Sequence, residues 1–80
     1  MATRIRIVDV QDGQEVTWAE LDGGQVTYAP TGQDIAEAVV RNRMNDFGVD
    51  LETAFAQLQQ DGWSNGYLMV DRAAGDERPA

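Results

Sequence analysis

The first third of the chain alternates hydrophobic and polar residues, which is the pattern of strands with one buried face. Residues 3–10 and 15–21 show this period of two, and a third run with the same period follows. Asp-Gly at residues 12–13 predicts a two-residue turn, and Asp-Gly-Gly at residues 22–24 predicts a three-residue loop. We therefore expect an antiparallel meander of three strands.

The lengths of these two turns predict which residues face each other. The first turn places Ile7 opposite Trp18, and the second places Trp18 opposite Tyr28. Both registers predict the same buried face, made of Ile5, Ile7, Val16, Trp18, Val26 and Tyr28. The other face then holds Arg4, Arg6, Thr17, Ala19, Leu21, Gln25 and Thr27. On this basis Trp18 and Tyr28 are predicted core residues.

Two helices are predicted after the meander. The first begins after Thr31, an expected N-cap, runs to about Phe47 and stops at Gly48. Its apolar stripe at helical spacing is Ile35, Ala36, Val39, Val40, Met44 and Phe47. The second is capped by Asp50 and closes at Gly62. Its inward residues are Leu51, Ala54, Phe55 and Leu58.

A last strand at residues 67–71 completes the predicted domain. The order β-β-β-α-α-β predicts an α+β fold of two layers, with a mostly antiparallel sheet and two helices on one face. Residues 1–71 form this single domain, and the polar segment 72–80 is expected to be a disordered tail.

The composition excludes several kinds of chemistry. The chain has 14 Asp or Glu, 6 Arg and no His or Cys, which gives a formal net charge of −8. Without His or Lys, the side chains that usually activate a Ser or Thr nucleophile are missing, and thiolate or imidazole metal sites are ruled out. Carboxylate pairs could still act as general acid and base, but they need a deeper cleft than a domain of this size usually has. The acid-rich segment 9–15 lacks the ligand spacing of a calcium loop and is interpreted as a turn with solvated acids. We expect a protein that is not an enzyme and has no cofactor or metal.

The sequence also predicts where the protein is located and whether it binds nucleic acid directly. The N-terminus lacks the apolar stretch of a signal peptide, and no window resembles a membrane span, so a soluble cytoplasmic protein is expected. A charge of −8 repels phosphate, which argues against direct nucleic-acid binding.

The acidic residues are segregated along the chain. Seven acids and no base lie between Arg6 and Arg41, and five more lie between Arg43 and Arg72. Carboxylates on helix and loop surfaces can mimic the spacing of backbone phosphates and occupy the basic groove of a nucleic-acid-binding protein. The predicted partner-binding acids are Asp12, Glu15, Asp22, Asp34, Glu37, Asp46, Asp50 and Glu52. The alternative is that these charges only maintain solubility.

A different site is predicted around two aromatic residues. Trp63 and Tyr67 flank a Ser-Asn-Gly turn before the last strand. They either pack at the edge of the core or form an apolar patch through which a small adaptor or structural protein binds its partner.

In its small size, acidity, lack of Cys and lack of an enzyme motif, the chain resembles the inhibitors that phages and other mobile elements direct against host defences, including anti-CRISPR proteins. This resemblance involves no sequence motif, so it assigns no residue. It implies a stoichiometric inhibitor that mimics DNA and binds a CRISPR surveillance complex or its nuclease where target DNA docks.

Overall fold

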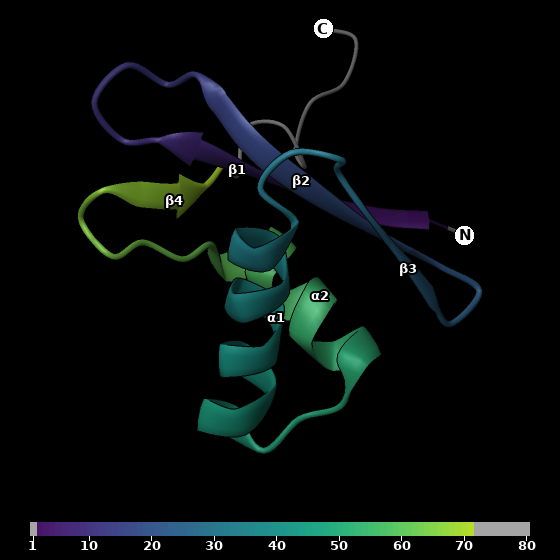
Figure 1. Cartoon of the computed structure of the whole chain (residues 1–80). Helices are drawn as coiled ribbons and strands as arrows, with labels where there is room; N and C mark the ends of the chain where they lie inside the picture. Colours follow the sequence, from purple (N-terminus) through teal and green to yellow (C-terminus); the bar gives the residue numbers. More distant parts are fainter. Residues whose placement is uncertain (1, 72–80) are drawn as a thin grey trace, which may run out of the picture.

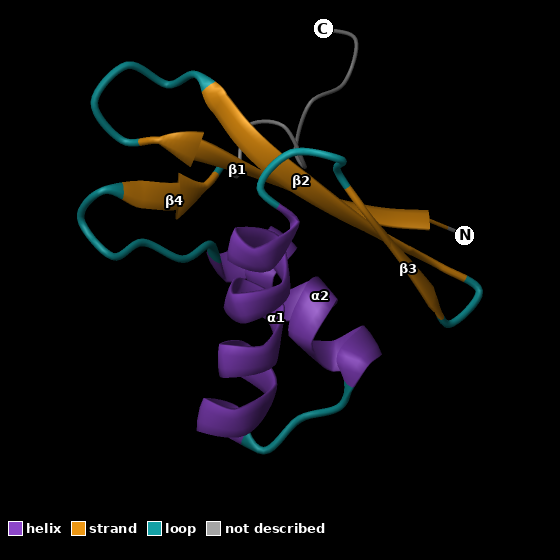
Figure 2. Ribbon diagram, viewed as in Figure 1, coloured by secondary structure: helices purple, strands orange, loops and turns teal. Residues whose placement is uncertain are grey.

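A computed structural model describes residues 2–71 as one sheet and two helices (Figure 1). The elements are β1 (Ala2–Asp9), β2 (Glu15–Asp22), β3 (Gln25–Tyr28), α1 (Gln33–Phe47), α2 (Leu51–Asp61) and β4 (Leu68–Val70). The strands lie in the order β3-β2-β1-β4, and all neighbours are antiparallel. Both helices lie on the same side of the sheet (Figure 2). The predicted α+β fold and element order are confirmed, and the predicted tail at 72–80 lies outside the described residues.

The core lies between the helices and one face of the sheet. Its buried residues are Ile5, Ile7, Ala19, Leu21, Ala36, Val39, Val40, Phe55, Leu58 and Val70. The predicted inward positions of α2 are confirmed, with Phe55 and Leu58 completely buried and Leu51 packed at the margin. The prediction for Phe47 is wrong, because this last residue of α1 is 61% exposed.

The predicted register between β1 and β2 is wrong by one residue. Ile7 faces Thr17 instead of Trp18, and a bulge between Ile7 and Val8 leaves Val16 without a partner on β1. The loop is also longer than two residues, since the Asp9 N–H donates to the Gln14 carbonyl at 2.9 Å. A shift of one residue moves every side chain of a strand to the other face.

The second turn shifts the register back by one residue. Gly23 and Gly24 both have positive φ, 61° and 84°, and form a two-residue turn that sets Ala19 opposite Tyr28. The two errors cancel for β3, so Tyr28 packs against the core as predicted. They do not cancel for β2, whose inward residues are Thr17, Ala19 and Leu21.

Trp18 consequently lies on the sheet face away from the helices, which corrects its assignment to the core. The Arg4 guanidinium carbon lies 4.2 Å from the centre of the Trp18 ring on this face. An arginine stacked on an indole stabilises by cation–π attraction and covers part of the ring. The outer face of the sheet therefore has its own Arg–Trp contact.

The helix ends agree with the sequence at three of four positions. Gly48 ends α1, Asp50 caps α2 and Gly62 ends α2, all as predicted. The N-cap of α1 is Gly32 instead of Thr31. A side chain at Gly32 would bring its Cβ to 2.9 Å from the Thr17 Cβ, so the chain needs glycine for this close approach as well as for its φ of 76°.

Candidate functional site

All of the excess negative charge lies in the part of the chain that the structure describes. Residues 2–71 contain 12 acids and 4 arginines, so they carry the whole net charge of −8. The position of the four arginines decides which acids remain uncompensated.

Arg6 is held by two carboxylates on the outer face of the sheet. Its Nε donates to Glu15 at 2.9 Å, and its Nη1 donates to Asp71 at 2.5 Å. Glu15, one of the predicted partner-binding acids, is therefore neutralised within the molecule. The contact also connects β2 to the residue that follows β4.

Arg43 is held by the helix layer. It donates to the Gln57 side chain at 3.3 Å and to the Gly62 carbonyl at 3.2 Å, and it lies 4.4 Å from the centre of the Phe47 ring. With Arg4 stacked on Trp18, three of the four described arginines have specific internal contacts. Arg41 is exposed on α1, one turn after Glu37.

The eight predicted acids fall into three separate groups. Asp12 and Glu15 belong to the β1–β2 hairpin, and Asp34 and Glu37 lie in the first half of α1. The others lie near the α1–α2 connection and the β2–β3 turn; they are Asp22, Asp46, Asp50 and Glu52, and we call them the acidic edge. The structure thus does not bring all eight together.

A groove lies between α2 and the β2–β3 turn, and Glu52 is the one residue of the acidic edge among its described lining residues. Glu52 and Ala56 of α2 line this groove of about 390 Å³ together with Gly23 and Gly24, which follow Asp22. Asp46 and Asp50 are exposed on either side of the short connection between the helices. The start of α2 and the β2–β3 turn therefore lie on the same side of the domain (Figure 1).

Asp50 has a structural role within this edge. Its Oδ1 accepts a hydrogen bond from the Thr53 backbone N–H at 2.9 Å, which caps α2. Hydrogen bonding by the Thr53 side chain and then by its backbone holds the pKa of Asp50 below its ordinary value of 3.8. Its charge is favourable at this helix N-terminus, so it serves folding first.

We expect the Asp50 cap to make stability depend on pH in the acidic range. Because the folded-state pKa is lowered, the stabilisation is present above the unfolded pKa of about 4 and is lost as pH falls through the folded pKa. Asp50→Asn keeps a capping oxygen that does not titrate. Urea unfolding between pH 2.5 and 7 should therefore show a smaller loss of stability in the variant below pH 4, and equal losses in both proteins would contradict this role.

Glu37 influences a neighbouring phenol. Burial raises the pKa of Tyr28 above its ordinary value of 10.0, the Glu37 carboxylate raises it further, and Arg41 opposes the rise. This links the first half of α1 to the end of β3. Asp34 and Glu37 remain exposed there.

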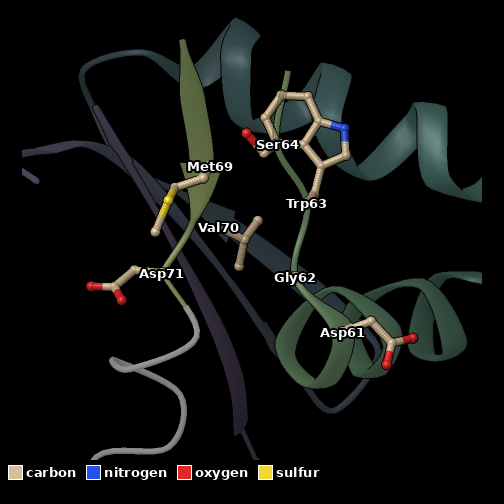
Figure 3. A pocket seen from close by; sticks show the side chains of 7 residues that line it. All are labelled: Asp61, Gly62, Trp63, Ser64, Met69, Val70 and Asp71. Carbon is tan, nitrogen blue, oxygen red and sulfur yellow. The ribbon is translucent and has the colours of Figure 1, made fainter. Parts of the chain in front are cut away.

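The aromatic pair Trp63 and Tyr67 is divided by the structure. Trp63 is half-buried and packs against the core, which supports its core role. It also lines an open surface pocket of about 470 Å³ (Figure 3). Tyr67 is 79% exposed and lines a different cavity with Val10, which is 44% exposed. An apolar patch therefore exists at Tyr67 and Val10 instead of between the two aromatic residues.

Sequence reasoning missed the Arg4–Trp18 contact, because the wrong register placed these two side chains on opposite faces of the sheet.

Within residues 2–71 no group of three acidic side chains is placed to hold a metal ion. Nor does either described helix combine the length and the apolar character needed to cross a membrane.

Comparisons with known proteins give no indication of function, so a function has to be inferred from the features described above. No protein-family model matches the chain, and neither curated proteins nor solved structures provide a significant match.

Proposed function

We propose that this protein is a non-enzymatic inhibitor that mimics nucleic acid and blocks the basic nucleic-acid-binding surface of another protein. The observation that carries the proposal is the uneven use of arginine. Three of the four described arginines are bound elsewhere, and among residues 2–71 no arginine forms an ion pair with Asp34, Asp46 or Glu52. These carboxylates are therefore available to cations of a partner.

The position of the acids supports this function. The carboxylates of the acidic edge project from a helix, a helix connection and a tight turn, which are anchored by the core. A rigid arrangement loses little entropy when it binds, and charges on it attract a basic partner over long range. Asp46 also lies in the last turn of α1, where a negative charge opposes the helix dipole and does not serve stability.

The mechanism is direct competition. Lys and Arg side chains that normally contact phosphates would contact carboxylates of the acidic edge and of Asp34 and Glu37 instead. The nucleic acid is excluded because the same cations cannot bind both. The partner we propose, from the resemblance to anti-CRISPR proteins, is a CRISPR surveillance complex or its nuclease.

A capture experiment with matched variants tests the proposal. The full chain is immobilised, exposed to a lysate of the host cell at low salt, and washed with increasing salt or with duplex DNA. We expect a nucleic-acid-binding protein to be retained at 50 mM salt and released by DNA, with affinity falling about tenfold or more by 500 mM. The purified partner should then lose DNA binding as the chain is added in stoichiometric amounts.

The variants separate a specific surface from net charge alone. Asp46→Asn combined with Glu52→Gln removes two charges from the acidic edge, and Asp76→Asn combined with Glu77→Gln removes two from outside the described residues. The first pair should weaken binding about fivefold or more and the second less than twofold. Equal effects, or retention that neither salt nor DNA reverses, would reject the mimic.

The exposure of Tyr67 and Val10 favours a second candidate, an adaptor that binds a protein partner through apolar contacts. Such binding would be insensitive to salt and lost in Tyr67→Ala. The same capture experiment distinguishes the two functions, because the mimic tolerates Tyr67→Ala and the adaptor tolerates the loss of Asp46 and Glu52.

A further inference from the structure

The two outer strands of the sheet are protected to different degrees. The outer side of β4 is occupied, because the Val70 N–H donates to the Trp63 carbonyl at 2.8 Å and an isolated bridge joins Met69 to Ser64. β3 is the outermost strand at the other end of the sheet (Figure 2). An outer strand with unpaired backbone groups can accept a further strand, so the backbone of β3 decides whether the sheet can be extended.

The hydrogen-bond pattern shows which backbone groups of β3 are unpaired. In an antiparallel pair, every second residue directs its N–H and C=O to the neighbouring strand. The Ala29 N–H donates to the Trp18 carbonyl at 3.0 Å, so Thr27, two residues earlier, also directs its groups to β2. The N–H and C=O groups of Val26 and Tyr28 point away from β2, and within residues 2–71 they have no hydrogen-bond partner. We call these groups the open side of β3.

Apart from its short length, β3 has none of the features that usually protect an outer strand. Its four residues are Gln-Val-Thr-Tyr, with no charged residue, no proline and no bulge. The connection to α1 does not cover the open side, because it runs back to β2, where Gly32 packs closely against Thr17 (Figure 1). The open side is therefore available to a short extended segment.

The charge next to β3 indicates which kind of segment fits. Glu20 of β2 lies opposite Thr27, and within residues 2–71 it forms no ion pair. Arg4, its neighbour on β1, lies over the Trp18 ring. A strand added to β3 would lie about 10 Å from β2, which is two strand spacings. A long basic side chain on its outer face could therefore reach the Glu20 carboxylate over the small Thr27.

A second copy of the chain fits this position poorly. Burial and then the Glu37 carboxylate raise the pKa of Tyr28, and Arg41 opposes the rise, so Glu37 also lies near the strand. Two copies paired through β3 would bring Glu20 and Glu37 of both chains to one interface, and each chain carries a net charge of −8. Like charges repel, so the charge favours a cationic segment over a second copy.

We propose that the open side of β3 binds an extended basic segment of the partner as an additional antiparallel strand. This direction is that of every other pair in the sheet, and antiparallel pairing is the more stable. Segment residues opposite Val26 and Tyr28 face the helix layer and are apolar, and those between them share the outer face with Glu20 and are basic. Main-chain hydrogen bonds supply affinity and the alternating side chains supply specificity. The inference rests on the proposed function, since the segment belongs to the basic partner.

Two isomeric peptides test the main-chain pairing. Both derive from acetyl-Val-Arg-Val-Arg-Val-amide, and each is titrated into the ¹⁵N-labelled full chain and followed by NMR. One isomer is N-methylated at its second and third valine, whose N–H groups would face β3. The other is N-methylated at its two arginines, whose N–H groups would point away. We expect the first isomer to bind about fivefold or more weakly than the second, because it loses donors to the carbonyl groups of Val26 and Tyr28.

Amide hydrogen exchange locates the added strand. In the free protein the N–H groups of Val26 and Tyr28 should exchange rapidly and that of Thr27 slowly, because only Thr27 donates to β2. With saturating unmethylated peptide, exchange at Val26 and Tyr28 should slow about fivefold or more. Exchange at Thr27 should change little, because its hydrogen bond is already present.

Variants of the chain complete the design. Val26→Pro removes one outward N–H and keeps the pairing with β2, since proline is tolerated where the N–H of an outer strand faces solvent. Val26→Ala is the matched control, because it also reduces the packing of Val26 against the core but keeps the N–H. The unmethylated peptide should bind Val26→Pro about threefold or more weakly than Val26→Ala. The comparison of the two isomers uses the native chain, so it holds even if Val26→Pro does not fold.

A second pair of variants tests the charge. Glu20→Gln should weaken the unmethylated peptide about twofold to threefold. Asp61→Asn should have no effect, because Asp61 ends α2 and lines the pocket beside β4, at the other end of the sheet. Equal effects of these two variants would overturn the choice of a basic segment.

The remaining outcomes separate this site from the proposed function. Equal binding of the two isomers, or unchanged exchange at Val26 and Tyr28, would overturn the added strand. A dimer of the free chain that sedimentation detects and Val26→Pro abolishes would overturn it in favour of a second copy. A captured partner that binds Val26→Pro as well as Val26→Ala would reject the open side of β3 but not the mimic. Peptide pairing at β3 with no salt-sensitive partner would reject the mimic but not the strand site.

Discussion

Replacement of Phe55 by alanine is expected to cost about 3–5 kcal/mol of unfolding free energy, the range for a buried phenylalanine. Phe55 of α2 is completely buried in the centre of the core, between the helix layer and the sheet. A domain of 80 residues has a total stability of about 4–12 kcal/mol, at ~0.05–0.15 kcal/mol per residue. The variant should therefore lose a large part of the total stability, and it should be unfolded if the native stability lies at the lower end of this range.

Phe47→Ala is the matched control, because it removes the same side chain from the 61% exposed end of α1. It should cost about 1 kcal/mol or less, since it loses only the stacking with Arg43. Urea unfolding followed by circular dichroism measures both. A similar cost for the two variants would show that the helices do not pack on the sheet as described.

Leu21→Ala is expected to destabilise the protein by about 2–4 kcal/mol, whereas Trp18→Ala is expected to cost about 1 kcal/mol or less. Leu21 is 5% exposed in the core, and Trp18 lies on the opposite face under Arg4. The register predicted from the turn lengths would give the reverse order, with the large tryptophan buried. The order of the two unfolding free energies, measured by urea unfolding, therefore tests which register of β2 is correct.

A cost for Trp18→Ala larger than that for Leu21→Ala would contradict the observed pairing of Ile7 with Thr17. Arg4→Ala is a useful companion, because it removes the cation from the Trp18 ring without touching the core. Its effect should be small and should vanish when Trp18 is already alanine, as expected for two residues that act only through each other.

The contacts that arginines make within the protein determine which acidic residues stay uncompensated. In the sequence, the arginines stand at the ends of the acidic tracts, and within the segment of α1 Arg41 and Arg43 lie at helical spacing from an acid of these tracts, Glu37 and Asp46 respectively. In the fold, Arg6 crosses to β2 and to the end of β4, where it neutralises Glu15 and Asp71. Of the predicted partner-binding acids, Glu15 is therefore paired within the molecule. Partner binding by the acidic edge and by the acids of α1 stays a prediction.

The sequence could predict which acidic residues are candidates for partner binding, but not how they are grouped on the surface. Acidic tracts that contain no arginine are visible in the sequence, and the structure places Asp34, Glu37, Asp46 and Glu52 at exposed positions. Their division into groups depends on where the elements lie, and so does the groove between α2 and the β2–β3 turn. The separation of Trp63 from Tyr67 likewise arises only when β4 pairs with β1.

Local patterns by themselves determined the elements of this protein, because strand alternation, the Asp50 cap and the glycines at 48 and 62 act through neighbouring residues. Tertiary structure alone decided which face of β2 is buried. Both faces of β2 carry hydrophobic residues, with Val16 and Trp18 on one and Ala19 and Leu21 on the other, so periodicity could not choose between them. The choice came from a bulge at Val16, a two-residue Gly-Gly turn and the close approach of Gly32 to Thr17, and a one-residue change in register exchanges the two faces.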